Sequence, residues 1–150
     1  MIEKGALPAN ALLQKYVQSG AYTDCYSTTI SADVSLADFV SAFYTTWLFK
    51  LERFILSIAV SKPSTDEEAI SLLGGERHTF AAWYVEDRAE DQLLMCDFRD
   101  QTRSWFMVSP GRIYFGSAVI PVQKNSFRWL LGFHRLYSRA LLAAAKSRLQ

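Results

Sequence analysis

Hydrophobic and polar residues follow one another along the chain in a pattern that predicts one strand, then helices, then four strands and a final helix. Residues 21–30 are rich in Tyr and Thr, which is typical of a strand. A helix is expected from Ser35 to about Ala59, because its apolar residues keep helical spacing along one side. Ser35 supplies the N-cap of that helix, and Asp38 places an acid in its first turn.

Two shorter helices are expected, one on each side of this segment. The first covers about residues 10–18 and ends at Gly20. The second begins at Ser64, which forms a capping-box pattern with Glu67, and stops at Gly74.

Four further strands are expected in quick succession, over residues 79–86, 92–98, 103–108 and 112–122. The connections between them are short enough for hairpins, which predicts an antiparallel meander. These strands carry apolar residues on both alternating faces, most clearly in 79–86 and 112–122, whereas a sheet with one solvated face alternates apolar with polar residues. Both faces of the sheet should therefore be covered, by helices on one side and by helices or a second subunit on the other.

The final helix is expected over about residues 126–148 and is strongly amphipathic. At about 100° per residue its bases gather on one side and its apolar residues on the opposite side. An apolar face packed on the sheet and a solvated basic face is the simplest interpretation, and binding to a membrane surface or an anionic partner is the alternative. The basic face consists of Arg128, Arg135, Arg139 and Lys146, and the apolar face of Leu130, Phe133, Tyr137, Leu141 and Ala144.

Composition and length indicate a single domain over residues 1–150, with 1–20 as an N-terminal extension and about 21–148 as its core. Hydrophobic residues make up 50% of the chain and charged residues only 21%, which leaves apolar surface for a large core, a ligand cavity or an oligomer interface. A monomer and a homodimer are equally compatible with this surplus.

Charge is distributed unevenly, although the formal net charge is only +1. Residues 101–150 contain no Asp or Glu, and they carry eight of the 16 Lys and Arg residues. Only four of those eight bases share a face of the last helix, and the acids of the earlier segments can fold back toward them. Binding to nucleic acid is therefore not expected.

The cysteines, the start of the chain and its most apolar segment indicate the cellular compartment. Cys25 and Cys96 lack the spacing of a metal or redox motif and are expected to be buried free thiols. The start of the chain does not resemble a secretory signal. Residues 39–60 are interrupted by charges at Lys50, Glu52 and Arg53, which disfavours a membrane span. A cytoplasmic location is expected.

Three stretches carry a resemblance to a known family: GRIYFGSAVIP at 111–121, FRWLLGFHRLYSRALL at 127–142, and WLFKLERFI at 47–55 with Trp47 and Arg53. With the order of elements, they resemble the DUF2867 family of the START/Bet v 1-like (SRPBCC, helix-grip) superfamily, over about residues 22–145. The resemblance implies a curved antiparallel sheet wrapped around a long C-terminal helix, with an apolar pocket between them. It implies no reaction, because the superfamily includes lipid carriers, hormone receptors, polyketide cyclases and hydroxylating subunits. The NTF2-like α+β cone is the alternative fold, although it does not normally end in a long helix.

Motifs for common enzyme chemistries are missing from the sequence. It contains no glycine-rich nucleotide fingerprint, P-loop, HExxH or GxSxG pattern. Only two histidines are present, which excludes a His-rich metal site, and neither a metal nor a cofactor is expected. The candidate acid–base residues are Asp24, Asp97 and His134, the two aspartates because strand alternation can turn them inward.

The function expected from these features is binding or carriage of a small hydrophobic or aromatic ligand in an internal cavity between the sheet and the C-terminal helix. One alternative is a cofactor-free cyclase, dehydratase or isomerase that uses one of the three acid–base candidates. The other is a peripheral module that binds anionic lipid, RNA or an acidic protein through the basic helix face. The aromatic residues expected to line the cavity are Trp83, Tyr84, Trp105, Tyr114, Phe115, Phe133 and Tyr137.

Overall fold

A computed structural model describes residues 1–45, 79–80, 83–97, 102–120 and 139–149 of the chain. Its centre is a seven-stranded sheet in the order β1-β2-β7-β6-β5-β4-β3, in which every pair of neighbours is antiparallel. The strands are β1 (Glu3–Lys4), β2 (Tyr22–Thr29), β3 (Thr79–Phe80), β4 (Trp83–Arg88), β5 (Gln92–Asp97), β6 (Thr102–Ser109) and β7 (Arg112–Val119). The expected α+β class with an antiparallel meander is confirmed.

Helices accompany the sheet at three places in the described ranges. They are α1 (Gln14–Gln18), α2 (Leu36–Tyr44) and the helical residues 139–149 of the expected C-terminal helix. The start of α2 is as expected: the Ser35 hydroxyl accepts a hydrogen bond from the Asp38 N–H, and the Asp38 carboxylate accepts one from the Ser35 N–H. The rest of the helix expected from Ser35 to about Ala59, and the helix expected over 64–74, lie outside the described residues. No helix in the described part of the chain is long and apolar enough to cross a membrane.

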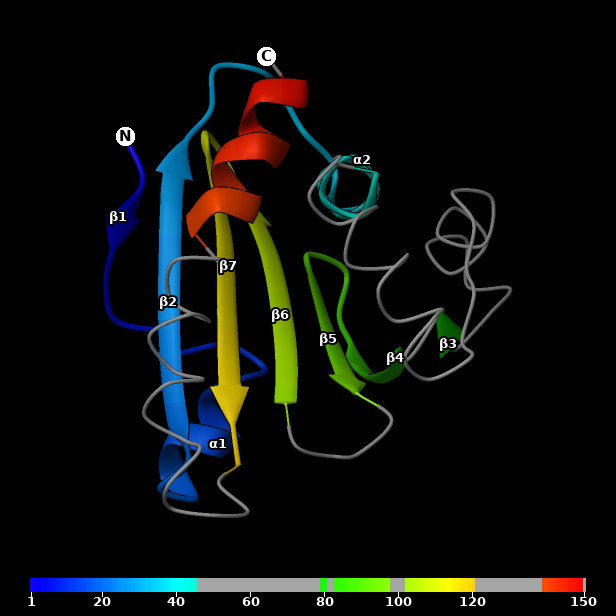
Figure 1. Cartoon of the computed structure of the whole chain (residues 1–150). Coiled ribbons are helices and arrows are strands. Elements are labelled where there is room, and N and C mark those ends of the chain that lie inside the picture. The colour runs from blue at the N-terminus through cyan, green and yellow to red at the C-terminus, as the bar shows by residue number, and fades with distance from the viewer. Residues whose placement is uncertain (46–78, 81–82, 98–101, 121–138, 150) are drawn as a thin grey trace.

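One face of the sheet, here called the helix-covered face, carries α2 and the C-terminal helix (Figure 1). The ring of Phe43 from α2 lies 4.8 Å from the ring of Phe106 and 4.7 Å from that of Phe115, measured between centroids. Leu141 and Leu142 of the C-terminal helix join the same buried cluster. The part of this face that lies under α2 and residues 139–149 is thus a close-packed aromatic and aliphatic core.

The other face, here called the N-terminal face, is covered by residues 7–16 (Figure 1). Leu13 is fully buried there against Trp105 and Leu94 of the sheet. The expectation that both faces are covered is confirmed, and the second layer comes from the start of the same chain. Residues 7–16 therefore contribute side chains to the core of this face, and β1 extends the sheet beside β2.

Gly116 allows the two layers of the N-terminal face to approach closely. Its cross-strand partner on β6 is Trp105. A Cβ atom at Gly116 would lie 2.8 Å from the backbone oxygen of Asp24, 2.9 Å from the indole ring of Trp105 and 3.1 Å from Leu13. The absence of a side chain at this position lets the Trp105 indole lie close to the backbone of β7.

Candidate functional site

A row of polar residues crosses the middle of the helix-covered face. Asp24 on β2 pairs with Ser117 on β7, and Ser117 pairs with Ser104 on β6. We call these three residues the polar row. Because side chains alternate along strands, they share a face with Tyr26 and Phe115, which belong to the apolar core of that face. The polar row therefore borders directly on the apolar core.

Asp24 is buried, with 4% of its surface exposed. Its Oδ1 accepts a hydrogen bond of 3.0 Å from the backbone N–H of Ser117, and its Oδ2 accepts one of 3.3 Å from the hydroxyl of Tyr22. Burial, followed by the charge of Asp24, raises the pKa of the neighbouring Cys25 thiol to about 11. Cys25 and Cys96 are both buried free thiols, as expected.

The hydroxyl of Ser117 is the least satisfied group of the polar row. Ser117 has no exposed surface, and its Oγ has no hydrogen-bond partner in the described part of the chain. Leaving such a group buried and unpaired costs about 1–3 kcal/mol, so an unpaired buried hydroxyl in a native protein calls for an explanation. The sequence did not point to Ser117, because a serine between glycine and alanine in an apolar strand resembles a small packing residue.

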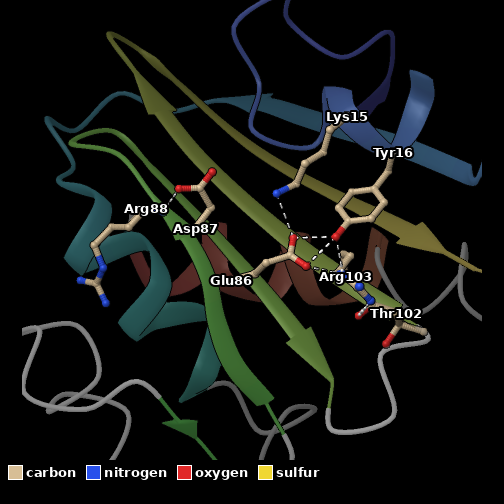
Figure 2. A network of polar contacts seen from close by, with 7 residues as sticks. All are labelled: Lys15, Tyr16, Glu86, Asp87, Arg88, Thr102 and Arg103. Atoms are coloured by element: carbon tan, nitrogen blue, oxygen red, sulfur yellow. Dashed lines mark hydrogen bonds and ion pairs between the residues drawn. The ribbon is translucent and has the colours of Figure 1, made fainter. Parts of the chain in front are cut away.

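A second polar cluster lies on the N-terminal face and consists of Lys15, Tyr16, Glu86 and Arg103 (Figure 2). The Tyr16 hydroxyl donates to the Glu86 carboxylate, whose oxygens lie 2.5 and 2.6 Å away. Arg103 Nε lies 2.8 Å from the Tyr16 hydroxyl and 2.9 Å from Glu86 Oε1, and Lys15 Nζ lies 3.3 Å from Glu86 Oε2. We call this group the Tyr16 cluster.

A break in strand pairing positions Glu86 for these contacts. The register between β4 and β5 shifts between Val85 and Asp87, so Glu86 is the extra residue of a bulge. Bulges redirect a side chain relative to its neighbours. In Figure 2 the side chain of Glu86 points toward Tyr16 and Arg103, whereas those of Asp87 and Arg88 extend away from the cluster.

The surroundings of the Tyr16 cluster favour a neutral Tyr16 and an ionised Glu86. Burial, followed by the hydrogen bond to Glu86, raises the pKa of Tyr16 to about 12. Burial opposes the charged form of Glu86, but the hydrogen bond from Tyr16 and the charges of Arg103 and Lys15 outweigh it and lower the pKa of Glu86. Since these groups satisfy one another, the cluster fastens α1 to β4 and β6.

The aromatic residues expected to line one cavity are divided between the two faces. Phe115 lies on the helix-covered face, where it packs against Phe43 and Phe106. Trp105 belongs to the buried cluster of the N-terminal face and the partly buried Tyr114 packs against that cluster, which differs from their expected position facing the C-terminal helix. Tyr84 pairs with Cys96, and Cys96 pairs with Arg103, so the register assigns Tyr84 to the N-terminal face as well.

The remaining candidates are described in part or not at all. The backbones of Trp83 and Asp97 pair across β4 and β5, and the described part of the structure does not include their side chains. Phe133, His134 and Tyr137 lie outside the described residues. Within the described ranges, no group of three or more His, Cys, Asp or Glu side chains is arranged to hold a metal ion.

The basic face expected for the last helix is described at two of its four positions. Arg139 is exposed, whereas Lys146 is partly buried and its Nζ donates a hydrogen bond of 3.0 Å to Thr28 Oγ1 on β2. Arg128 and Arg135 lie outside the described residues. A groove of about 200 Å³ runs beside Lys146, and it is lined by Met1, Ile2, Ala143, Lys146 and Ser147.

Comparison with known proteins identifies no relative of this chain. No protein-family model, curated protein or solved structure matches the chain. What the structure supports on its own is the α+β arrangement of an antiparallel sheet with α2 and the C-terminal helix on one face. The interpretation of the polar row therefore depends on its own geometry.

Proposed function

We propose that the protein binds a small, largely apolar ligand against the helix-covered face, with the polar end of the ligand at Asp24 and Ser117. The observation that carries the proposal is the buried Ser117 hydroxyl, which has no partner in the described residues and lies beside the buried Asp24 carboxylate. Binding sites for small molecules typically combine an apolar lining with a few placed polar groups. We also place the chain among helix-grip proteins, in which such a site lies between the sheet and the C-terminal helix.

The positions of the residues on the sheet limit which of them can line the proposed site. Phe115 lies two residues before Ser117 on β7, and Tyr26 lies two residues after Asp24 on β2, both on the same face, so they supply the apolar side of the proposed site. Trp105 and Tyr114 are not included, because they pack against the N-terminal segment on the opposite face. The proposed site is thus smaller than one lined by all the aromatic residues of the meander.

Asp24 is suited to orienting a ligand. Its carboxylate accepts a hydrogen bond from the Ser117 N–H and one from the Tyr22 hydroxyl, and these bonds hold the carboxylate in a defined orientation. This supports a binding role, in which Asp24 holds a hydrogen-bond donor of the ligand.

Native mass spectrometry of protein purified from its own cells tests the proposal. We expect a non-covalent adduct whose mass disappears under denaturing conditions, and a lower occupancy in Asp24→Asn. The matched control is Glu3→Gln, which changes an exposed carboxylate that pairs with Arg112 on the sheet edge and should leave the adduct intact. Protein that carries no adduct, and from which organic solvent extracts no small molecule, would contradict the proposal.

A further inference from the structure

We infer that the groove beside Lys146 is a second binding site, which takes a free, single-chain amphiphile with an anionic head group, such as a medium-chain carboxylate. The groove lies between Met1 and Ile2 on one side and the C-terminal helix on the other, at the β1 edge of the sheet. This site goes beyond the proposed function, because it lies away from the polar row. Thr28, which contacts Lys146, comes four residues after Asp24 on β2, or about 13 Å along the strand.

The size and lining of the groove suit a short apolar chain. Its volume is about 200 Å³. Ala143 and Ser147 lie one turn apart on the same side of the C-terminal helix, and their small side chains leave the space open. The remaining apolar lining comes from Met1 and Ile2, and Ile2 also packs against the core of the helix-covered face. The volume equals that of about seven water molecules in the liquid, which is less than a drug-sized ligand needs.

Lys146 provides a positive charge at a fixed position beside this space. Its Nζ donates a hydrogen bond of 3.0 Å to Thr28 Oγ1, and the Thr28 hydroxyl donates one of 3.1 Å to the backbone oxygen of Met1. Thr28 is fully buried, so this chain of hydrogen bonds restrains the ammonium group. A lysine ammonium has three donors, and the bond to Thr28 uses one of them. Within the described residues Lys146 forms no ion pair, so an anionic group can accept from the other donors.

The described charges around the groove favour an anion. None of the residues that line it is acidic. Lys4 lies, through the pairing of β1 with β2, on the same face of the sheet as the C-terminal helix. Glu3, the acid of β1, extends to the opposite face, where its carboxylate pairs with Arg112 at 3.2 Å. Arg139 is exposed and lies on the same side of its helix as Ala143, four residues away. These charges make the potential beside the groove positive.

The described surface favours a free molecule over a membrane as the source of the anion. A helix that lies on a membrane presents several large apolar side chains together with its bases. Among the described residues, the exposed large apolar ones are Met1 and Val17. Val17 belongs to α1, which lies near the opposite end of β2 from the C-terminal helix (Figure 1). Leu141 and Leu142 of the C-terminal helix are buried in the core. A groove with one restrained charge therefore fits a single soluble amphiphile.

Head group and chain should each contribute to affinity. Because a hydrogen bond to a charged group is worth about tenfold or more, octanoate should bind at least about tenfold more tightly than octan-1-ol. Octylammonium should bind more weakly than octanoate, because the positive potential repels it. A fully buried CH₂ group contributes about fourfold in affinity, and a groove buries it only in part. The affinity should therefore rise from butanoate to octanoate by less than about fourfold for each CH₂ group.

Nuclear magnetic resonance titration of the full-length, isotope-labelled protein tests this site. The probes are octanoate, octan-1-ol and octylammonium, each below the concentration at which it forms micelles or separates from water. We expect octanoate to shift the amide signals of Ile2, Ala143 and Ser147, and to bind at least about tenfold more tightly than octan-1-ol.

Three variants separate the charge from the space. Lys146→Met removes the charge and keeps an unbranched side chain, so its affinity for octanoate should fall by about tenfold or more. Arg148→Met is the matched control on the same helix, because Arg148 donates to the Thr45 backbone oxygen and does not line the groove. Its affinity should stay within about twofold of the wild type. Ala143→Trp fills the groove from an exposed position and should abolish binding. Circular dichroism checks that each variant is folded, and Ala143→Trp still tests the site if Lys146→Met unfolds.

Several results would overturn this second site. Octanoate that leaves the groove amides unshifted, or that binds no more tightly than octan-1-ol, would do so. Octanoate shifts confined to Asp24 and Ser117 would also remove the groove site, while they would support the proposed function. Sedimentation with phosphatidylglycerol vesicles that Lys146→Met abolishes, in a protein whose groove amides octanoate does not shift, would identify a membrane-binding surface instead. Failure at the groove and failure at the polar row are thus distinguished by which amides respond.

Discussion

The Asp24 carboxylate accepts a hydrogen bond from the backbone N–H of Ser117 while the hydroxyl of the same serine has no partner in the described residues. The bond joins neighbouring strands, because Asp24 and Ser117 are partners in the register of β2 and β7. It fixes the carboxylate next to an unsatisfied hydroxyl within a buried face. An unpaired buried hydroxyl lowers the stability of the free protein, and in the proposed function it is the group that a ligand would satisfy.

Removal of the Ser117 hydroxyl should therefore not destabilise the ligand-free protein. We expect Ser117→Ala to leave the free energy of unfolding unchanged or to raise it by up to about 1 kcal/mol, because an unpaired buried polar group is replaced by an apolar one. Urea unfolding of delipidated protein measures this difference. A decrease of more than about 1 kcal/mol would show that the hydroxyl is already hydrogen-bonded in the free protein.

Ser27→Ala is the matched control for that measurement. Ser27 lies on the same strand as Asp24, and its Oγ accepts a hydrogen bond of 2.8 Å from Arg112 Nη1. Loss of this bond should cost about 1 kcal/mol. Opposite signs for the two serine variants would distinguish a satisfied hydroxyl from an unsatisfied one.

Most of the fold could be predicted from the sequence, because its strands and turns are determined locally. The alternating pattern, the short connections and the Ser35–Asp38 cap all correspond to elements of the structure. β1 was not predicted, because two exposed residues such as Glu3 and Lys4 form a strand only through their pairing with β2. The cover of the N-terminal face was not predicted either, because the short helix expected over about residues 10–18 carries no local signal of the surface on which it packs.

Substitution of Gly116 should show how tightly the N-terminal face is packed. Gly116→Ala would bring a methyl group to within 3 Å of both the Asp24 backbone oxygen and the Trp105 indole, neither of which can move away freely. We expect a loss of about 1–3 kcal/mol in the free energy of unfolding, which is typical of overpacking. The comparison is with Gly5→Ala, where an added Cβ meets nothing within 4 Å and the change should stay within about 0.5 kcal/mol. Equal effects at the two glycines would refute the close contact.

Tyr16 should ionise only in strongly alkaline solution. Its pKa is raised to about 12, chiefly by burial and then by the hydrogen bond to Glu86. A raised pKa in the folded state means that the associated stability is complete below the ordinary value of about 10 and is lost as the pH rises toward 12. Ultraviolet difference titration of the wild type against Tyr16→Phe measures the transition directly. A difference spectrum that titrates near pH 10 would be inconsistent with the Tyr16 cluster.

Glu86 should make the protein sensitive to acid. Its pKa is lowered in the folded state, so its contribution to stability is present above the ordinary glutamate pKa and is lost as the pH falls through the lower folded value. We expect Glu86→Gln to be less stable than the wild type near neutral pH, because it loses charge-assisted hydrogen bonds to Tyr16 and Arg103. The loss should be only about 1–2 kcal/mol, because these bonds are partly exposed to solvent. That difference should shrink below about pH 4. Unfolding curves across this range measure it, with exposed Glu90→Gln as the control; a difference independent of pH would contradict the assignment.

The candidate site was only partly predictable, because strand alternation identifies which residues share a face without identifying what covers that face. Asp24 was anticipated on this basis. Trp105 and Tyr114 were expected beside the C-terminal helix, but they lie opposite it because the N-terminal segment covers their face. The Tyr16 cluster joins side chains that are 70 and 17 residues apart, and no local pattern reveals such a contact.

Binding of a ligand on the helix-covered face at the polar row is tested most directly by isotope-filtered nuclear Overhauser spectroscopy. The labelled protein is mixed with unlabelled 2-naphthol or with the molecule that co-purifies from cells. We predict contacts from the apolar protons of the ligand to Phe115 and Tyr26, and from its polar end to Ser117 and Asp24. Contacts to Trp105 and Tyr114 on the N-terminal face, or no contacts at all, would contradict the account.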